Sequence, residues 1–277
     1  MATQGYEREV VVLAGKRTGF GTFGGSLKDL SATDLGVFSS TAAIEAAGIT
    51  PDQVDHTFFG NALQTSADAI YLARHIALRS GIPDEKPALT INRLCGSGFE
   101  AVVQGAKEII LGEADVALTG GTESMSQAPH VVRGARWGGL RLGPASGQFE
   151  DLLWGALTDT NCGLSMAQTA EELAERYGVT RSEVDEVAFH SQQRAKAAWD
   201  DGRFDIEVTG VGLRTRKGET TYRADEHIRP DTTVEGLSAL RPYFKDDGLV
   251  TAGNASGMGD GSATAILASA EWAEANG

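Results

Sequence analysis

Residues 88–111 constrain this chain most, because they join an apolar run, a cysteine and a helix without a linker. Residues 88–94 are typical of a buried strand, and the apolar residues after Cys95 recur at helical spacing, at Phe99, Val102, Val103, Ala106, Ile109 and Ile110. We therefore expect Cys95 at a helix N-terminus, where free N–H groups and the helix dipole favour a thiolate. This makes Cys95 a candidate covalent nucleophile; the alternative is a small buried core residue.

The composition excludes several classes of protein. With 277 residues and 41% hydrophobic content, the chain is globular and forms one large domain or two of ordinary size. A formal net charge of −14 argues against a nucleic-acid partner and against an anionic membrane surface. Only seven of the 24 basic residues are lysines, and this excess of carboxylates suggests a protein adapted to high salt.

Two further features bound the function. No apolar run approaches the roughly 20 residues that cross a bilayer, and the first residues lack a basic segment followed by an apolar core. We therefore expect a cytoplasmic protein without a membrane span. Cys95 and Cys162 are too few for a disulfide framework and lie in no metal-ligand spacing, so we expect no metal site.

Strands and helices alternate along the first 120 residues. We expect strands at 9–14, 54–59, 88–94 and 114–119, and helices at 31–47, at 67–79 and after Cys95. This order predicts parallel βαβ units in a layered α/β domain, with ligands at the carboxyl ends of the strands. Further along, the pattern predicts helices at 165–177 and 181–201, a strand at 262–269 and a helix from Glu271.

Three early glycines, Gly19, Gly21 and Gly24, spell the dinucleotide-binding pattern GxGxxG. In that motif the glycines open a helix at once, so that its N-terminus meets a pyrophosphate. Here six residues intervene, and the next helix is expected to begin near Ser31 with a capping box completed by Asp34. The spacing therefore argues against dinucleotide binding.

Two segments carry unbalanced charge. Residues 151–210 hold twelve acids against five bases, which we interpret mostly as a solvated face. Residues 211–230 are basic instead, through Arg214, Arg216, Lys217, Arg223 and Arg229. This basic set would suit a phosphate-bearing ligand or would be an ordinary polar hairpin, and the sequence leaves both interpretations open.

Five motifs resemble one known family. They are RTGFGTFGGSLKDL from Arg17, NRLCGSGFEAV around Cys95, GGTESMS from Gly120, DEHIRP from Asp225 and TAGNASGMGDG from Thr251. Together and in this order, they resemble the thiolases, a family of acyl-CoA acyltransferases. The resemblance runs from about residue 8 to residue 270.

The resemblance implies a thiolase-like layered α/β fold with helices between mixed sheets. Residues 1–120 and 248–277 would form the N-terminal core, 121–247 an inserted loop domain that binds coenzyme A, and the C-terminal half would be absent. Cys95 would accept the acyl group, and the substrate or coenzyme channel would be lined by Leu157, Met166, Arg229, Phe244, Ala252, Ala255, Ser256 and Gly257. Ser165 stands where the family often has histidine, and Gly236 where it often has serine.

Three family motifs do not occur: an NEAF-like asparagine, a GHP-like histidine and a CxGGG-like second cysteine. These groups supply the base and part of the oxyanion hole, and the five histidines present are expected to be structural or exposed. The resemblance thus implies a thiolase that makes or cleaves 3-ketoacyl-CoA and needs a missing half or a partner chain. The alternatives are another condensing enzyme of the superfamily, or a non-catalytic subunit that binds coenzyme A.

The resemblance also bounds cofactors and partners. Coenzyme A thioesters would be substrates, and no metal or redox cofactor would be needed, because a thioester already activates its carbonyl and α-carbon. We expect a homo-oligomer or a complementing thiolase chain, since an uncovered inner face favours a partner. Residues 127–148, rich in Gly, Pro and Arg, are expected to leave the sheet and to form an oligomer contact.

Overall fold

The computed structural model describes residues 8–138, 149–216 and 218–277. Clustering of contacts divides the chain into two compact units. The first unit comprises residues 1–127, 205–226 and 259–277, and the second comprises 128–204 and 227–258. The domain bounds expected from the sequence, at 120 and 248, stay a prediction; β10, at residues 208–209, pairs with β1 inside the first unit.

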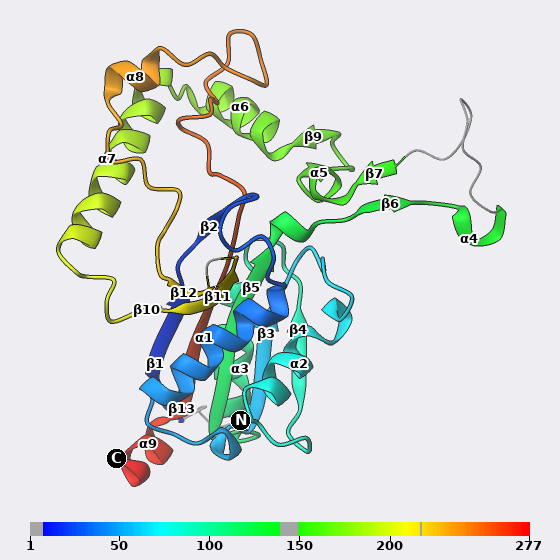
Figure 1. Ribbon diagram of the computed structural model, residues 1–277, viewed down its shortest axis with the longest axis vertical. Helices are drawn as coiled ribbons and strands as arrows, with labels where there is room; N and C mark the ends of the chain where they lie inside the picture. The colour runs from blue at the N-terminus through cyan, green and yellow to red at the C-terminus, as the bar shows by residue number, and fades with distance from the viewer. Residues whose placement is uncertain (1–7, 139–148, 217) are drawn as a thin grey trace, which may run out of the picture. The chain divides into compact units, whose positions relative to one another are not determined.

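A seven-stranded mixed sheet forms the centre of the first unit (Figure 1). Its order is β10-β1-β13-β5-β3-β4, with β2 also pairing to β13. The strands are β1 (Val10–Thr18), β2 (Gly21–Thr22), β3 (His56–Gly60), β4 (Ala88–Ile91), β5 (Val116–Ser124), β10 (Val208–Thr209) and β13 (Gly259–Ser269). The β3, β4 and β5 strands are mutually parallel, whereas β13 runs antiparallel to both β1 and β5.

The expectation of parallel units, made for the first 120 residues, is therefore confirmed for β3, β4 and β5. It did not extend to β13, which runs antiparallel to its neighbours. Hydrophobic periodicity specifies which residues face the core, but it carries no information on strand direction. The β13 strand enters between β1 and β5 from far along the chain, with Asp260 opposite Ser124 and Ala268 opposite Val116. The result is a mixed sheet, as the family resemblance implied.

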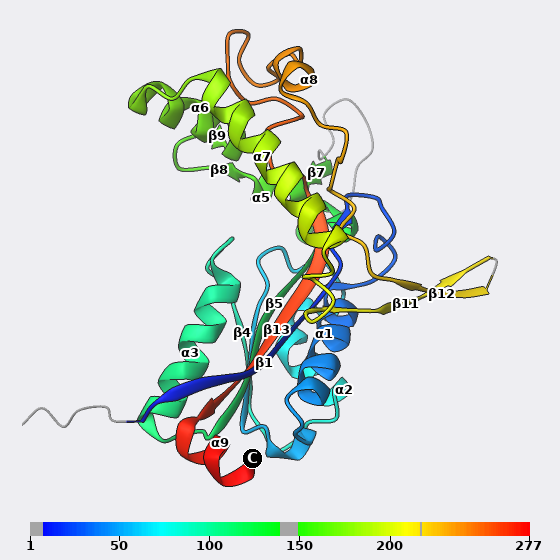
Figure 2. The ribbon, with the colours of Figure 1, turned by 90° about the vertical axis from the view of Figure 1, so that its left-hand side faces the viewer.

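Helices cover both faces of this sheet (Figure 2). The α1 (Ala32–Ala46) and α2 (Leu72–Arg79) helices pack on one face, and α3 (Ser97–Leu111) lies on the other. Neighbouring residues of one strand point to opposite faces, so Leu118 joins the core under α1 and α2 while Ala117 packs under α3. The last helix, α9 (Ala270–Asn276), places Trp272 against the larger core.

Sequence signals marked the helix ends well. Ser31 caps α1 in a capping box with Asp34, as expected, and Gly112 ends α3 in the left-handed conformation with a φ of 77°. Short 3₁₀ helices occupy Pro51–Gln53, Ala69–Tyr71 and Met125–Gln127. The glycines of the GxGxxG pattern lie in and around β2, before a turn, and no helix opens there within the described residues. Their placement agrees with the argument against dinucleotide binding.

The DEHIRP motif anchors the early glycine-rich loop to the first unit. The Asp225 carboxylate accepts from the Arg17 guanidinium, at 2.8 and 3.0 Å, and from the Phe20 N–H at 2.8 Å. The Glu226 carboxylate accepts from the Thr22 N–H at 2.8 Å and from the Ser26 hydroxyl. Burial alone would raise the pKa of Glu226, but the Ser26 and Thr22 hydrogen bonds outweigh it and lower that pKa.

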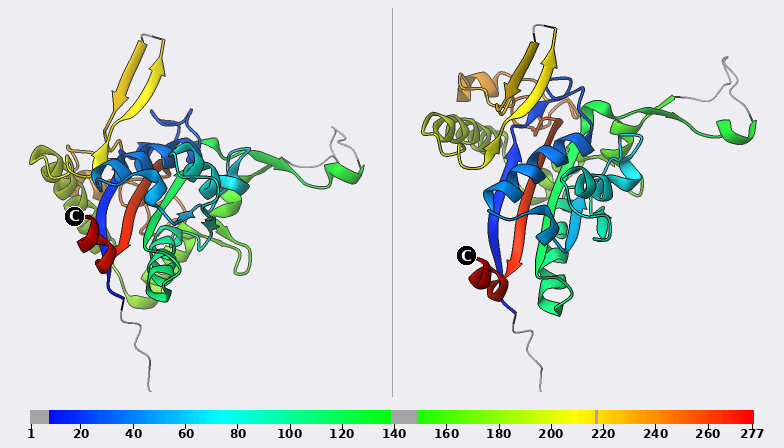
Figure 3. Two further views of the ribbon diagram at one scale, coloured as in Figure 1. Left: turned by 90° about the horizontal axis from the view of Figure 1, so that it is seen from below. Right: turned by 60° about the horizontal axis from the view of Figure 1, so that its bottom comes forward.

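A hairpin, β11 (Val211–Thr215) and β12 (Gly218–Tyr222), extends away from the sheet (Figure 3), with Val211 and Tyr222 buried at its base. Arg214 lies 3.5 Å from Glu219 on this hairpin, and Arg223 donates to the Val208 carbonyl at 2.7 Å. Arg229 belongs to the second unit, and Lys217 lies outside the described residues. Residues 211–222 thus form a hairpin, and whether the basic residues of 211–230 meet a phosphate-bearing ligand stays a prediction.

The second unit is built mainly from helices and short hairpins. Its helices are α4 (Ala135–Gly138), α5 (Leu152–Ala156), α6 (Met166–Tyr177), α7 (Arg181–Asp200) and α8 (Val234–Ser238), and its strands are β6 (His130–Val132), β7 (Phe149–Asp151), β8 (Thr158–Asp159) and β9 (Leu164–Ser165). The β6 and β7 strands pair, as do β8 and β9. Residues 139–148 of the expected oligomer contact lie outside the described residues. Among the helices that the structure describes, each is too short or too polar to cross a bilayer.

Candidate functional site

The Cys95 thiol is exposed and directly precedes Gly96, the N-cap of α3. The β4 strand ends at Ile91, three residues earlier than expected, because residues 92–95 form a turn instead of extending the strand. Within this turn Leu94 has a φ of 50°, a conformation that non-glycine residues seldom adopt. The alternative of a buried core cysteine is therefore wrong.

Ser97 ties this turn together from the first turn of α3. Its hydroxyl accepts from the Arg93 N–H at 2.9 Å and donates to the Leu94 carbonyl at 2.6 Å. The Ser97 residue is only 5% exposed, so both bonds are shielded from water. These bonds hold the backbone on both sides of the thiol.

Two strand glycines admit the start of α3 close to the sheet. A Cβ on Gly60, the last residue of β3, would lie 2.6 Å from the Ser97 carbonyl carbon, and a Cβ on Gly121 would lie 3.2 Å from the Gly98 Cα. Only glycine permits such an approach at Gly60 without a backbone shift. The thiol is thus placed at the carboxyl ends of the parallel strands, as the sequence predicted.

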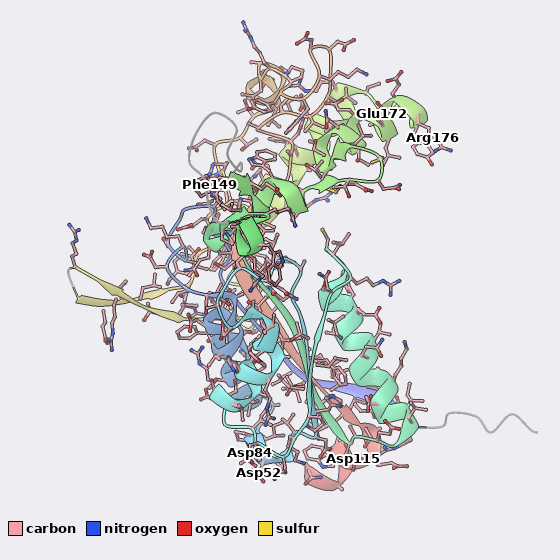
Figure 4. The ribbon with its side chains drawn as sticks, turned by 90° about the vertical axis from the view of Figure 1, so that its right-hand side faces the viewer. Asp52, Asp84, Asp115, Phe149, Glu172 and Arg176 are labelled. Carbon is pink, nitrogen blue, oxygen red and sulfur yellow. The ribbon has the colours of Figure 1, made fainter. Side chains whose placement is uncertain are left out.

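Three aspartates lie far from this end of α3. Figure 4 shows Asp52, Asp84 and Asp115 at the end of the first unit where β5 begins and α3 finishes. The 15 residues of α3 span about 22 Å, which is more than two screening lengths at physiological salt. In the first turn itself, the Glu100 carboxylate is paired with Arg93, which lowers the pKa of Glu100.

The first unit also joins the GGTESMS and TAGNASGMGDG motifs. Asp260 is fully buried, and its carboxylate accepts from the Ser126 N–H at 2.9 Å and from the Ser126 hydroxyl. The Ser126 hydroxyl in turn accepts from the Gly24 N–H at 2.8 Å. The loop after β5 is therefore fixed by a buried carboxylate.

All eight residues assigned to the coenzyme or acyl channel belong to the second unit, whereas Cys95 belongs to the first. Leu157 and Met166 lie together, because the Met166 N–H donates to the Leu157 carbonyl at 2.9 Å. Ala252, Ala255, Ser256 and Gly257 share one exposed loop. The remaining two stand apart in the chain: the Arg229 side chain is exposed and Phe244 is half-buried.

Two carboxylates that the charge pattern did not single out hold this loop. Glu171 of α6 accepts from the Leu249 N–H, at 2.8 and 2.9 Å, and from the Val250 N–H at 2.7 Å. Asp185 of α7 accepts from the Asn254 amide at 2.8 Å. Both carboxylates are buried, so the solvated-face interpretation does not apply to them.

Other positions have local structural roles. The His227 ring packs against Gly257, where an added Cβ would lie 2.4 Å from the ring. Ser165 caps α6 in a capping box with Gln168, and the Gly236 N–H donates to the Thr233 hydroxyl at 3.0 Å at the start of α8. His56 stacks on Phe58 at 4.0 Å, and burial lowers its pKa, partly opposed by Glu113. In the part of the chain that the structure describes, no group of three His, Cys, Asp or Glu side chains is arranged to hold a metal ion.

Comparison with known proteins identifies the family. The family described as "Thiolase, N-terminal domain" matches residues 10–271. This chain belongs to the thiolase family. A human mitochondrial 3-ketoacyl-CoA thiolase is 55% identical over 262 residues, which cover 95% of this chain and 66% of that protein. A beta-ketothiolase of Cupriavidus necator is 45% identical over 271 residues, which cover 98% of this chain and 68% of that protein.

Solved thiolases confirm the expected layered α/β fold. The crystal structure of human mitochondrial 3-ketoacyl-CoA thiolase matches with a TM-score of 0.93 and 53% identity over 97% of this chain and 67% of that one. A crystal structure of the same human thiolase in complex with CoA matches with a TM-score of 0.91. The chain thus spans about two thirds of its relatives, and 66% of the human mitochondrial protein.

The prediction of a cytoplasmic protein is wrong. It is contradicted by relatives from Homo sapiens, Pongo abelii and Bos taurus, 52–55% identical, each named as a mitochondrial 3-ketoacyl-CoA thiolase. The physical reason is that a compartment is chosen by a targeting segment that is removed from the mature protein.

Proposed function

We propose that this chain supplies the acyl-accepting half of a thiolase active site, with Cys95 as the nucleophile. The observation that carries the proposal is the exposed Cys95 thiol at the N-terminus of α3, held by a strained and hydrogen-bonded turn. Membership of the thiolase family supports it. A thiol in this position is accessible to an acyl group.

In the cleavage direction, the Cys95 sulfur adds to the 3-keto carbonyl carbon of a 3-ketoacyl-CoA. The bond between carbons 2 and 3 then breaks, its electron pair leaves with the acetyl-CoA fragment, and that carbanion takes up a proton. The acyl group, now a thioester on Cys95, passes to the sulfur of free coenzyme A. Synthesis follows the same steps in reverse.

The second unit is proposed to bind coenzyme A through its exposed loop 252–257 and through Leu157, Met166, Arg229 and Phe244. The solved human relative in complex with CoA supports this class of ligand. An arginine is suited to the phosphates, and the small residues at 252–257 allow the pantetheine arm to approach the backbone.

The base and the proton donor are proposed to come from further polypeptide that carries the histidine and second-cysteine motifs. Two observations support this requirement: the chain covers 66% of the human relative, and apolar side chains of α3 are exposed, with Phe99 at 80%. Such residues on a helix that faces a core are typical of an interface. Homo-oligomers of the complete enzyme are part of the same proposal.

Acyl trapping tests the proposal. The complete enzyme is mixed with radiolabelled acetyl-CoA, quenched in acid and digested, and the labelled peptide is identified. We expect label on the Cys95 peptide, loss of that label in Cys95→Ser, and unchanged label in Cys162→Ser, whose cysteine is also exposed. Retention of the label in Cys95→Ser would refute the assignment, and tight binding of coenzyme A without any acyl label would favour a non-catalytic subunit.

A further inference from the structure

We propose that Asn92 is a positioning residue for the Cys95 thiol and that Glu123 anchors it through the loop 61–63. The inference rests on the proposed role of Cys95 as the nucleophile. It concerns residues of the first unit alone. These residues are connected by hydrogen bonds, which run from Asn92 through the loop 61–63 to Glu123.

Backbone strain marks both ends of this network. In the described ranges, the non-glycine residues with positive φ are Gln64, at 53°, and Leu94, at 50°. Such a conformation is unfavourable for a residue with a Cβ, and strain of this kind persists only where neighbours impose it. An asparagine side chain accepts the N–H of each strained residue: Asn92 from Leu94 at 3.0 Å, and Asn61 from Gln64 at 3.2 Å.

The two asparagines are connected through one short loop. The Asn92 amide donates to the Ala62 carbonyl at 3.2 Å, so the side chain bridges this loop and the turn that carries Cys95. Asn61 is only 1% exposed, and its amide donates to the Thr122 carbonyl at 2.9 Å and to the Glu123 carboxylate at 2.7 Å.

Glu123 closes the network at the end of β5. Its carboxylate also accepts from the Ala62 N–H at 3.0 Å and, at 3.4 Å, from the Leu63 N–H. Burial raises the pKa of this carboxyl, although these N–H groups and the Asn61 amide favour its charged form. The Glu123 carboxylate accepts hydrogen bonds from two N–H groups of the loop 61–63. These bonds hold the loop in place, and with it the Ala62 carbonyl that accepts from the Asn92 amide.

The consequence concerns the direction of the thiol. Cys95 is exposed, so packing does not orient its side chain. Its direction follows from the backbone of Leu94, and Asn92 compensates the unfavourable conformation there. Loss of Asn92 would let Leu94 relax toward negative φ and would turn the thiol away from the end of the strands.

The test compares Asn92→Ala with Asn92→Ser in the complete enzyme. A serine hydroxyl accepts, more weakly, the N–H two residues ahead, so it retains part of the local bond. We measure the rate of acetyl transfer to Cys95 in a single turnover, KM and kcat, the melting temperature, and the alkylation rate of Cys95 by iodoacetamide relative to Cys162 in the same molecule. Cys162 is a suitable internal reference because it is also exposed.

The matched control is Asp159→Ala. The Asp159 carboxylate accepts from the Asn161 N–H at 2.8 Å, which is the same two-residue turn placed just before Cys162. This variant is expected to leave acetyl transfer to Cys95 within about twofold of wild type. It shows what the loss of such a turn does at a site without the proposed role.

We expect Asn92→Ala to lower acetyl transfer and kcat by about 10- to 100-fold with KM within about twofold, because a misplacement of about 1 Å has effects of this size. Asn92→Ser should retain an intermediate rate. Adding Leu94→Gly to Asn92→Ala should restore part of the loss, since glycine adopts positive φ without help. If Asn92 had a merely structural role, Asn92→Ala would lower the melting temperature without lowering kcat at a constant KM, and Leu94→Gly would not restore acetyl transfer.

Acetyl transfer and a Cys95-to-Cys162 alkylation ratio within twofold of wild type in Asn92→Ala would overturn the inference, while loss of label in Cys95→Ser would still uphold the proposed function. Persistent label in Cys95→Ser would refute both. If Asn92→Ala does not fold, Asn92→Ser decides the test. A wild-type rate of acetyl transfer in Asn92→Ser would then overturn the inference.

Discussion

Replacing Gly60 by alanine tests how the sheet sets the position of the Cys95 thiol. The added Cβ would lie 2.6 Å from the Ser97 carbonyl carbon and 2.7 Å from the Ser97 Cβ and carbonyl oxygen. Ordinary contact begins near 3.4 Å, so the start of α3 must move by about 0.8 Å, the difference between these two distances. Because Cys95 directly precedes this helix, the thiol must move with it.

Two effects of the substitution oppose each other in stability. Overpacking of this kind costs roughly 1–3 kcal/mol, and the loss of backbone freedom in the unfolded chain returns about 0.4–1 kcal/mol. The net loss of about 1–2 kcal/mol corresponds to a melting temperature lower by about 2–3 °C in a chain of this size. The shift of the thiol acts separately and should slow acetyl transfer by about 10- to 100-fold.

The assay measures the melting temperature by circular dichroism and the alkylation rate of Cys95 relative to Cys162. The control is Gly212→Ala on β11, where an added Cβ meets no atom within 4 Å. This control should leave both quantities nearly unchanged. If Gly60→Ala behaved like Gly212→Ala in both measurements, the backbone would be absorbing the Cβ and the reasoning would be refuted.

Two further predictions concern buried and hydrogen-bonded carboxylates. Asp185→Asn removes the charge that pairs with Arg181 at 2.7 Å and that accepts from the Asn254 amide, so the free energy of unfolding should fall by about 3 kcal/mol in urea titrations. Glu186→Gln, at an exposed neighbour, should change that free energy by less than about 0.5 kcal/mol. Equal effects of the two substitutions would contradict the account. The folded pKa of Glu226 lies below its usual 4.5, so its stabilisation is complete above that value and is lost as the pH falls through the folded pKa. The difference in stability between wild type and Glu226→Gln should therefore be largest near neutral pH and should narrow on acidification, and a constant difference would contradict the assignment.

Local features of the fold could be predicted because their causes are local in sequence. Ser31 and Asp34 lie three residues apart, so their capping box is visible without any tertiary contact. The helix after Cys95 follows from apolar spacing, and its end follows from Gly112. For the same reason the position of Cys95 at a helix start was predictable, although the unusual backbone of Leu94 was not.

The supporting residues of the site were harder to predict, for two reasons. Asn92, Glu123 and Asn254 lie inside motifs that the sequence displays, where a polar residue among small ones is the available signal. Glu171 and Asp185 gave no signal, since an acidic residue on a charged helix resembles a solvated one. Their burial depends on a loop that comes more than sixty residues later in the chain.

The sequence alone determined the family, the alternation of strands and helices in the first 120 residues, and the cysteine that opens α3, because each depends on residue types at short spacing. Tertiary structure decided the antiparallel insertion of β13 and the close approach of α3 to Gly60. It also decided the burial of Asp185 and the network around Asn92. These features depend on pairings between distant segments, whose direction and distance are not written in any local pattern.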